Sequence, residues 1–281
     1  MKIIKNILIV ILTFININLV VGLIVSINFP KVLSGTINDL LINEISYKNY
    51  KEPNIIINKD AKSTKDLVTT DSEEVNKILQ SPAIQQLLED YINKTISSIN
   101  NPEELENIDF EKDAMNYIKQ NQEKIEQATG VKITDEMLNN VQNDLEDKEI
   151  NNVVKQRIKN TSKNLTKEEK VLLKGYSSFI SPTCRIIIIS VFLLNLLLIA
   201  IIKKSFVKWI SNLGTSLLVG GIETIILSFA VKLIVSLKNS NINFNIKILI
   251  KWGLIIGVLG LIIIMVYNII IKKQRKELAY E

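Results

Sequence analysis

The sequence predicts an all-α membrane protein with four transmembrane helices and a mostly helical extracytoplasmic domain inserted between helices 1 and 2. Three observations predict this architecture. The chain of 281 residues carries four long apolar runs, a long polar stretch separates the first two runs, and lysines and arginines gather beside the runs. Each run approaches or exceeds the ~20 apolar residues that an α-helix needs to cross ~30 Å of hydrocarbon.

The runs and the segments between them define the expected organisation. In order, we expect a short cytoplasmic N-terminus (1–5), transmembrane helix 1 (6–29), the extracytoplasmic helical domain (30–183), transmembrane helix 2 (184–202), a cytoplasmic amphipathic loop (203–213), transmembrane helix 3 (214–236), an extracytoplasmic loop (237–247), transmembrane helix 4 (248–271) and a basic cytoplasmic tail (272–281). A cleaved signal peptide is the alternative for the first run. An uncut anchor is favoured, because the apolar stretch is longer than a usual signal-peptide core and no A-x-A-like cleavage site follows it.

The charges predict the orientation of the chain. Between Lys31 and Pro182 there are 20 Lys+Arg and 26 Asp+Glu, whereas the remainder has 14 Lys+Arg and 3 Glu. Positive residues beside transmembrane helices mark the cytoplasmic side. Three basic clusters fall on one side if all four runs cross: Lys2 and Lys5; Lys203, Lys204 and Lys208; Lys272, Lys273, Arg275 and Lys276. We therefore expect a multi-pass cell-membrane protein with both termini cytoplasmic, and a lipid bilayer rather than nucleic acid as the partner of these charges.

Helix-start signals recur along the extracytoplasmic domain. They are Asp71 with Glu74, Ser81 before Pro82, Asn101-Pro102 with Glu104, Thr134, and Thr166 with Glu169. Such residues cap the first turn of helices. We expect helix 1 to continue past the membrane, a brief extended piece at 53–57, and a helix after Ser81. Further helices are expected from Asn101 to a stop at Gly130, from Thr134 through Ile158, and from Thr166 to the membrane, which together favour a helical bundle.

Residues for catalysis or metal binding do not assemble in the sequence. The chain has no His and one Cys, Cys184, so the commonest metal ligand and acid–base group is missing. The acidic run from Asp144 to Glu149 lacks the Gly of a calcium loop. Nucleotide-binding and hydrolase motifs are also missing. We expect no catalytic residues, metal or cofactor, and we interpret the carboxylates as solvated helix faces.

Glu223 carries the sharpest functional signal, because it lies near the middle of the predicted third span. A carboxylate at that depth is costly unless it is protonated, paired or facing water. Lys232 is about 13 Å further along the helix axis, too far for a direct pair. Candidate companions are Asn195, Asn268, Asn16 and Asn18. Glu223 either binds a proton, cation or polar substrate, or hydrogen-bonds to a neighbouring helix and sets its register.

Small residues mark the third and fourth spans. Gly220 and Gly221 precede Glu223, and Gly253, Gly257 and Gly260 follow at the spacing that lets helix backbones approach closely. We interpret these five glycines as packing residues at a crossing of spans three and four. The lysines and aromatic residues of 203–213 predict an interfacial anchor, with a docking element for a cytoplasmic partner as the alternative.

The order of one span, a large exterior domain and three further spans resembles permease-like subunits of the FtsX and MacB type. The resemblance covers topology alone and transfers no site residues. The first hypothesis is a non-enzymatic integral membrane protein whose exterior domain binds or senses a partner at the cell envelope, a membrane or envelope protein or a second copy of the chain. The second is a permease or transporter subunit that uses Glu223. The use of Ile, Asn and Lys is typical of an AT-rich bacterial genome.

Overall fold

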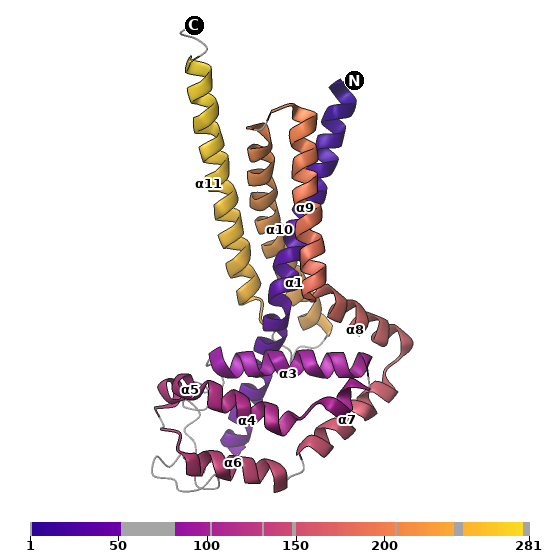
Figure 1. Ribbon diagram of the computed structural model, residues 1–281, viewed down its shortest axis with the longest axis vertical. Coiled ribbons are helices and arrows are strands. Elements are labelled where there is room, and N and C mark those ends of the chain that lie inside the picture. Colours follow the sequence, from indigo (N-terminus) through magenta and orange to yellow (C-terminus); the bar gives the residue numbers. More distant parts are fainter. Residues whose placement is uncertain are drawn as a thin grey trace. The chain divides into compact units, whose positions relative to one another are not determined.

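The computed structural model describes residues 2–51, 82–101, 103–130, 132–147, 150–205, 207–238 and 244–277. Across these ranges the chain is helical and has no strand, which confirms the all-α prediction (Figure 1). The helices are α1 (Lys2–Lys51), α3 (Pro82–Asn100), the 3₁₀ turn η1 (Glu104–Asn107), α4 (Phe110–Gln120), α5 (Gln122–Thr129), α6 (Asp135–Asp147), α7 (Ile150–Asn164), α8 (Lys167–Phe179), α9 (Pro182–Lys203), α10 (Lys208–Lys238) and α11 (Lys247–Glu277). The extended piece expected at 53–57 and the cap expected at Asp71 lie outside the described residues.

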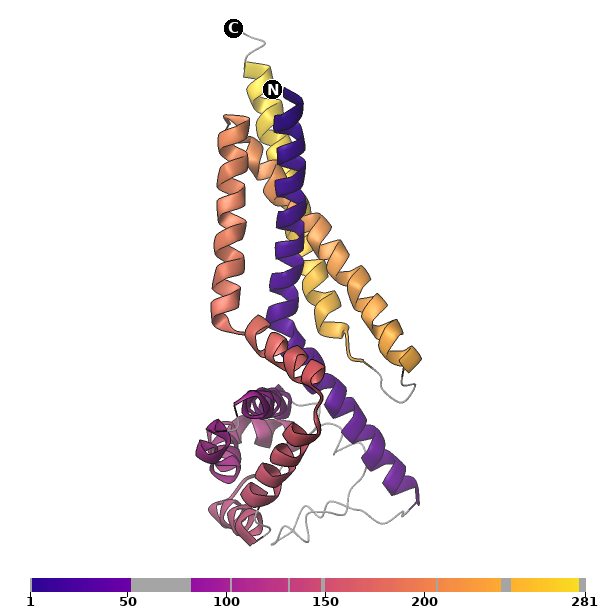
Figure 2. The ribbon, with the colours of Figure 1, turned by 90° about the vertical axis from the view of Figure 1, so that its right-hand side faces the viewer.

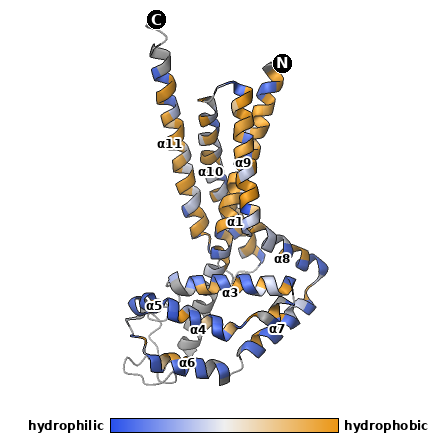
Figure 3. Ribbon diagram, in the orientation of Figure 1, coloured by the Kyte–Doolittle hydropathy of each residue, from blue (hydrophilic) through white to orange (hydrophobic). Residues whose placement is uncertain are grey.

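The chain divides into two compact units. The apolar unit comprises Met1–Val32 and Ser178–Glu281, and the polar unit comprises Leu33–Ser177. Figure 3 shows this division as hydropathy, with hydrophobic residues concentrated on α9, α10, α11 and the first half of α1, and hydrophilic residues on α3 to α8. The two units bury their apolar residues in different ways.

Four helices of the apolar unit are long and apolar enough to cross a membrane. The candidate spans are Ile3–Ile37, Pro182–Lys203, Trp209–Lys238 and Lys247–Lys273. Many of their large hydrophobic side chains are exposed, among them Ile186, Leu254 and Ile269. Apolar surface of this extent is stable in a lipid environment rather than in water.

The helix that contains the first span continues well beyond it. α1 is 50 residues long, which corresponds to about 75 Å at ~1.5 Å per residue. Pro30 lies inside the helix, where it removes one backbone donor, and its side chain is fully buried. The predicted continuation of this helix beyond residue 29 is confirmed.

The helix ends of the apolar unit follow from local chemistry. Ser181 caps α9 by accepting a hydrogen bond of 3.2 Å from the Cys184 N–H, and Pro182 occupies the first turn. Lys204 ends α9 in a left-handed conformation, with φ of 49°. α10 then begins at Lys208, so the prediction of a loop over 203–213 is wrong for its second half, which is helical.

Figures 1 and 2 show that four chain positions of the apolar unit lie at the same end of its helices. These are the N-terminal end of α1, the C-terminal end of α9, the start of α10 and the C-terminal end of α11. The three basic clusters of the sequence belong to these positions. Nine Lys and Arg residues therefore lie at this end of the unit, against five near the opposite ends of the spans: Lys31, Arg185, Lys238, Lys247 and Lys251.

The polar unit consists of shorter helices, and two of the predicted ones are divided. The helix expected from Asn101 to Gly130 is three elements, η1, α4 and α5, because Asp109 rather than Glu104 caps the main helix. The Asp109 side chain accepts from the Lys112 N–H, whereas the residue that precedes η1, Glu103, makes no capping bond with its side chain. The helix expected from Thr134 through Ile158 is likewise two helices, α6 and α7.

Other predicted helix signals are confirmed. Gly130 stops α5 with φ of 69°, in the left-handed region that favours glycine. Thr134 accepts from the Met137 N–H at 3.3 Å at the start of α6. Thr166 and Glu169 form the reciprocal capping box, with bonds of 2.8 and 3.2 Å.

The core of the polar unit lies between α3, η1, α4 and α7. Leu105, Phe110 and Ile158 are almost fully buried and pack against three partly buried residues, Ile99, Ile108 and Val154. The Tyr91 ring packs on the Phe110 ring at a centroid distance of 5.1 Å. This core draws on helices far apart in sequence, which holds the polar unit together as a tertiary structure.

Candidate functional site: polar and small residues inside the apolar unit

Glycines bring α10 and α11 into backbone contact. A Cβ atom built on Gly221 would lie 2.6 Å from the Gly257 nitrogen, and one on Gly260 would lie 2.6 Å from the Gly214 carbonyl oxygen. Gly253 is equally close to α10, with the Gly221 carbonyl oxygen 2.8 Å from its Cβ position. Any side chain at Gly214, Gly221, Gly253 or Gly260 would force these helices apart.

Gly220 performs the same role towards a different helix. Its Cβ position lies 2.8 Å from Val20 Cγ1 and 3.2 Å from the Ile17 carbonyl oxygen, both in α1. The adjacent pair Gly220 and Gly221 therefore places α10 between α1 on one side and α11 on the other. Gly257 has a looser contact, since its Cβ position lies 3.8 Å from the Leu218 carbonyl oxygen.

A chain of hydrogen bonds joins three helices near the basic end of the apolar unit. Lys203 of α9 donates to Asn212 Oδ1 of α10. The Asn212 amide donates to Thr13 Oγ1 of α1 at 2.7 Å, and Thr13 donates to the Ile9 carbonyl at 2.7 Å. Asn212 was not among the predicted site residues, because residues 203–213 were predicted to form a loop outside the span.

A second polar contact joins α1 to α9 at the opposite end. Arg185 donates from Nη2 to the Ser26 carbonyl at 2.9 Å and from Nε to Ser26 Oγ at 3.3 Å. The Ser26 hydroxyl in turn donates to the Phe179 carbonyl at 2.6 Å. Ser26 is fully buried. A buried carbonyl oxygen without a hydrogen-bond donor is unfavourable, and the Arg185 guanidinium supplies that donor.

Between these two contacts lie three buried polar residues from three helices. Asn16 of α1 and Ser216 of α10 are 0% exposed, and Asn195 of α9 is 8% exposed. Both polar atoms of Asn16, Nδ2 of Asn195 and Oγ of Ser216 have no hydrogen-bond partner among the described residues. Asn195 was a candidate from the sequence, and Ser216 was not.

The other candidates lie elsewhere. Glu223 is half-buried on α10, and no hydrogen bond or ion pair joins it to Lys232, Asn195 or Asn268 in the described part of the chain. Asn268 is exposed on α11. Asn18 is exposed and donates to the Phe14 carbonyl of its own helix at 2.9 Å. The structure therefore does not assemble the expected companions around Glu223.

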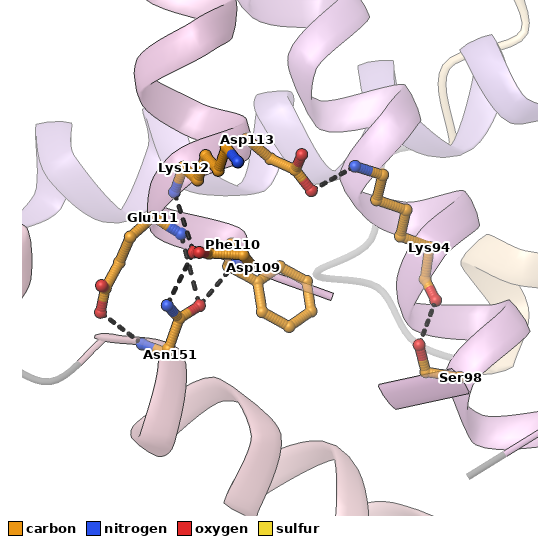
Figure 4. A network of polar contacts seen from close by, with 8 residues as sticks. All are labelled: Lys94, Ser98, Asp109, Phe110, Glu111, Lys112, Asp113 and Asn151. Carbon is orange, nitrogen blue, oxygen red and sulfur yellow. Dashed lines mark hydrogen bonds and ion pairs between the residues drawn. The ribbon is translucent and has the colours of Figure 1, made fainter. Parts of the chain in front are cut away.

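The polar unit has one prominent network of side chains, which is structural (Figure 4). Asn151 Oδ1 accepts from the backbone N–H of Phe110 at 2.7 Å and of Glu111 at 3.3 Å. Its amide donates to Asp109 at 2.8 Å, and its own backbone N–H donates to Glu111 at 2.9 Å. The first turns of α4 and α7 thus cap each other, while Lys94 pairs with Asp113 beside them.

The pKa directions in the polar unit follow these contacts. The Lys112 N–H and the Asn151 amide lower the pKa of Asp109, and the Lys159 ammonium lowers the pKa of Glu106. Burial, with Glu89 nearby, raises the pKa of Tyr176 to about 12. These carboxyl groups are stabilised in the ionised form, which does not favour a general acid at neutral pH.

Chemically, the residues gathered here hold helices together. Across the described ranges, no group of three or more His, Cys, Asp or Glu side chains is arranged to hold a metal ion. Cys184 is a free, half-buried thiol. Gly214 could have been recognised in the sequence, because it precedes Gly221 by two helical turns.

Comparison of the chain with protein-family models, with curated proteins and with solved structures found no match.

Proposed function

We propose that the chain is a non-enzymatic integral protein of the cell membrane whose polar unit faces the extracytoplasmic side and binds or senses a protein partner there. The observation that carries the proposal is the pairing of four candidate spans with a separately packed polar unit. The basic clusters at one end of the spans support cytoplasmic termini, because positive residues are retained on that side of a membrane.

The surface of the polar unit indicates the kind of partner. Acidic residues begin several of its helices, and Glu123, Asp135 and Glu136 are exposed. Exposed lysines such as Lys124 and Lys132 stand among them, but acidic residues are in excess, with 26 Asp+Glu against 20 Lys+Arg between Lys31 and Pro182. A net negative charge attracts a partner of the opposite charge and raises its association rate. A basic surface on a membrane or envelope protein, or on a second copy of the chain, is the expected complement.

Site-specific photocrosslinking in intact cells tests this proposal. A benzophenone amino acid is placed at one exposed position on each helix of the set Lys112, Glu123, Glu136 and Arg157. We expect a discrete crosslinked protein at positions on one face. The crosslink should be lost when whichever of Glu123 and Glu136 does not carry the probe is changed to Lys. Absence of a discrete product from all four positions would contradict the proposal.

A second candidate, a permease or transporter subunit, is favoured by one observation. Glu223 is a half-buried carboxylate within a candidate span, and such residues mark substrate or ion pathways in other membrane proteins. The Glu223→Gln variant separates the two accounts. Normal abundance and assembly with loss of an ion-dependent activity would favour transport, whereas loss of assembly would assign Glu223 to helix packing.

A further inference from the structure

The unpartnered atoms of Asn16, Asn195 and Ser216 belong to three different helices, yet contacts around them place them together. A buried amide or hydroxyl without a partner is unfavourable, so such groups in a folded protein call for a ligand or a neighbour. The positions of the three residues along their helices decide whether one ligand can reach all of them.

The register of α1 against α10 follows from two contacts, one on either side of Asn16. Thr13 meets Asn212, and Val20 meets Gly220. Asn16 is three residues beyond Thr13 and Ser216 is four beyond Asn212, which correspond to about 4.5 and 6 Å of helical rise. Because both pairs advance in the same direction, Asn16 and Ser216 lie at nearly the same depth.

The register of α9 leads to the same depth. Gly22 of α1 faces Ile188 of α9, and these helices run in opposite directions, since Ser26 meets Arg185. Seven residues, or two turns, separate Ile188 from Asn195 and return them to one face of α9. Two turns counted from Gly22 towards the N-terminus of α1 end beside Asn16.

The faces of the helices also agree. On α1, Asn16 lies between the positions that contact α10 (Thr13, Val20) and those that contact α9 (Gly22, Ser26), counted at about 100° per residue. On α10, Ser216 lies midway along the stripe from Asn212 to Gly220. The three residues are therefore buried at the junction of α1, α9 and α10.

We propose that this junction is a hydration site, in which buried water is held by the amides of Asn16 and Asn195 and the hydroxyl of Ser216. The unpartnered atoms offer N–H donors together with the acceptors Asn16 Oδ1 and Ser216 Oγ. Water both donates and accepts, and two to four polar partners are what a buried water requires.

The chemistry of the site disfavours an ion. None of its three side chains is charged, and the N–H donors of two amides would oppose a cation. Lys203, the basic group one to two turns away, contacts Asn212. Glu223 lies seven residues beyond Ser216, about 10 Å along α10, outside hydrogen-bond reach. The proposed site therefore depends neither on the role of Glu223 nor on partner binding by the polar unit.

Water-edited solid-state NMR on the full chain in lipid bilayers, with ¹⁵N in the Asn side chains, tests the proposal. Sequential correlations through the labelled backbone assign the signals, so no variant has to fold. The Asn16 and Asn195 side-chain amides should receive magnetisation from water several-fold faster than that of Asn18, which faces outward on α1 and bonds within its own helix. Transfer no faster than to Asn18 would overturn the proposal.

A Ser216→Ala variant distinguishes a bound water from direct hydrogen bonds among the three side chains. With water as ligand, the two amides keep measurable water transfer, reduced by the loss of one partner. If Ser216 instead bonds directly to an amide, the variant shifts that amide signal while neither amide receives water magnetisation in either protein. That second result would overturn the hydration site.

Discussion

Arg185 reaches across from α9 and donates from Nη2 to the Ser26 carbonyl of α1 at 2.9 Å. The contact joins two helices that are separated in sequence by the whole polar unit. It also gives a charged residue at the edge of a candidate span a structural role, because the guanidinium satisfies a backbone acceptor inside a proline-containing helix.

Replacing Arg185 with Ala should destabilise the apolar unit by about 1–3 kcal/mol, because a hydrogen bond from a charged donor is lost and the Ser26 carbonyl stays buried. Thermal unfolding in a mild detergent measures the effect. Arg157→Ala, at an exposed position of α7, is the matched control and should change the midpoint little. Equal midpoints for the two variants would argue against the contact.

Gly221→Ala should weaken the pairing of α10 and α11, because its methyl group would overlap the Gly257 backbone. Overpacking of this kind typically costs about 1–3 kcal/mol. Gly175→Ala is the control, since nothing lies within 4 Å of its Cβ position and alanine favours the helix by roughly 0.5–1 kcal/mol. The two variants should shift the unfolding midpoint in opposite directions, and a stabilised Gly221→Ala protein would refute the close approach.

Asn151→Ala should destabilise the polar unit, because the N–H groups of Phe110 and Glu111 lose their side-chain acceptor. Loss of a helix cap usually costs about 0.5–2 kcal/mol. Urea unfolding followed by circular dichroism measures it, with Asn160→Ala on the exposed face of the same helix as control. If the Asn160 variant lost as much stability, the reciprocal capping of α4 and α7 would not account for the effect.

The ionised Asp109 should make the polar unit sensitive to acid. The Lys112 N–H and the Asn151 amide lower its folded-state pKa below the ordinary 3.8. Its contribution is therefore fully present above that pH and is lost as pH falls through the folded-state pKa. The stability difference between wild type and Asp109→Asn should be largest near neutral pH and shrink below pH 3.8; a difference independent of pH would contradict the assignment.

Local signals in the sequence predicted much of the fold. The four apolar runs, the Gly130 stop and the Thr166–Glu169 capping box depend on neighbouring residues alone, and the structure confirms four apolar helices and both helix signals. The sequence predicted a helix from Asn101 with Glu104, whereas Asp109 caps α4. The contact that distinguishes Asp109, from Asn151, comes from 42 residues away and leaves no local trace.

The interior of the apolar unit was harder to predict for the same reason. Glu223 was predicted as a site because it is a carboxylate near the middle of a span, yet the polar contacts between helices are made by Asn212, Thr13 and Arg185. Uncharged Asn, Ser and Thr are common throughout this chain, so their burial becomes visible only when the register of the helices is known. The glycine spacing was informative because it is itself periodic.

The orientation of the polar unit is the claim on which the proposed function depends, and cysteine labelling tests it most directly. In a Cys184→Ser background, single cysteines are placed at Glu123, exposed on α5, and at Lys273, exposed near the end of α11. A membrane-impermeant maleimide is then applied to intact cells. We predict labelling at position 123 at once and at position 273 only after permeabilisation; the reverse pattern would contradict the account.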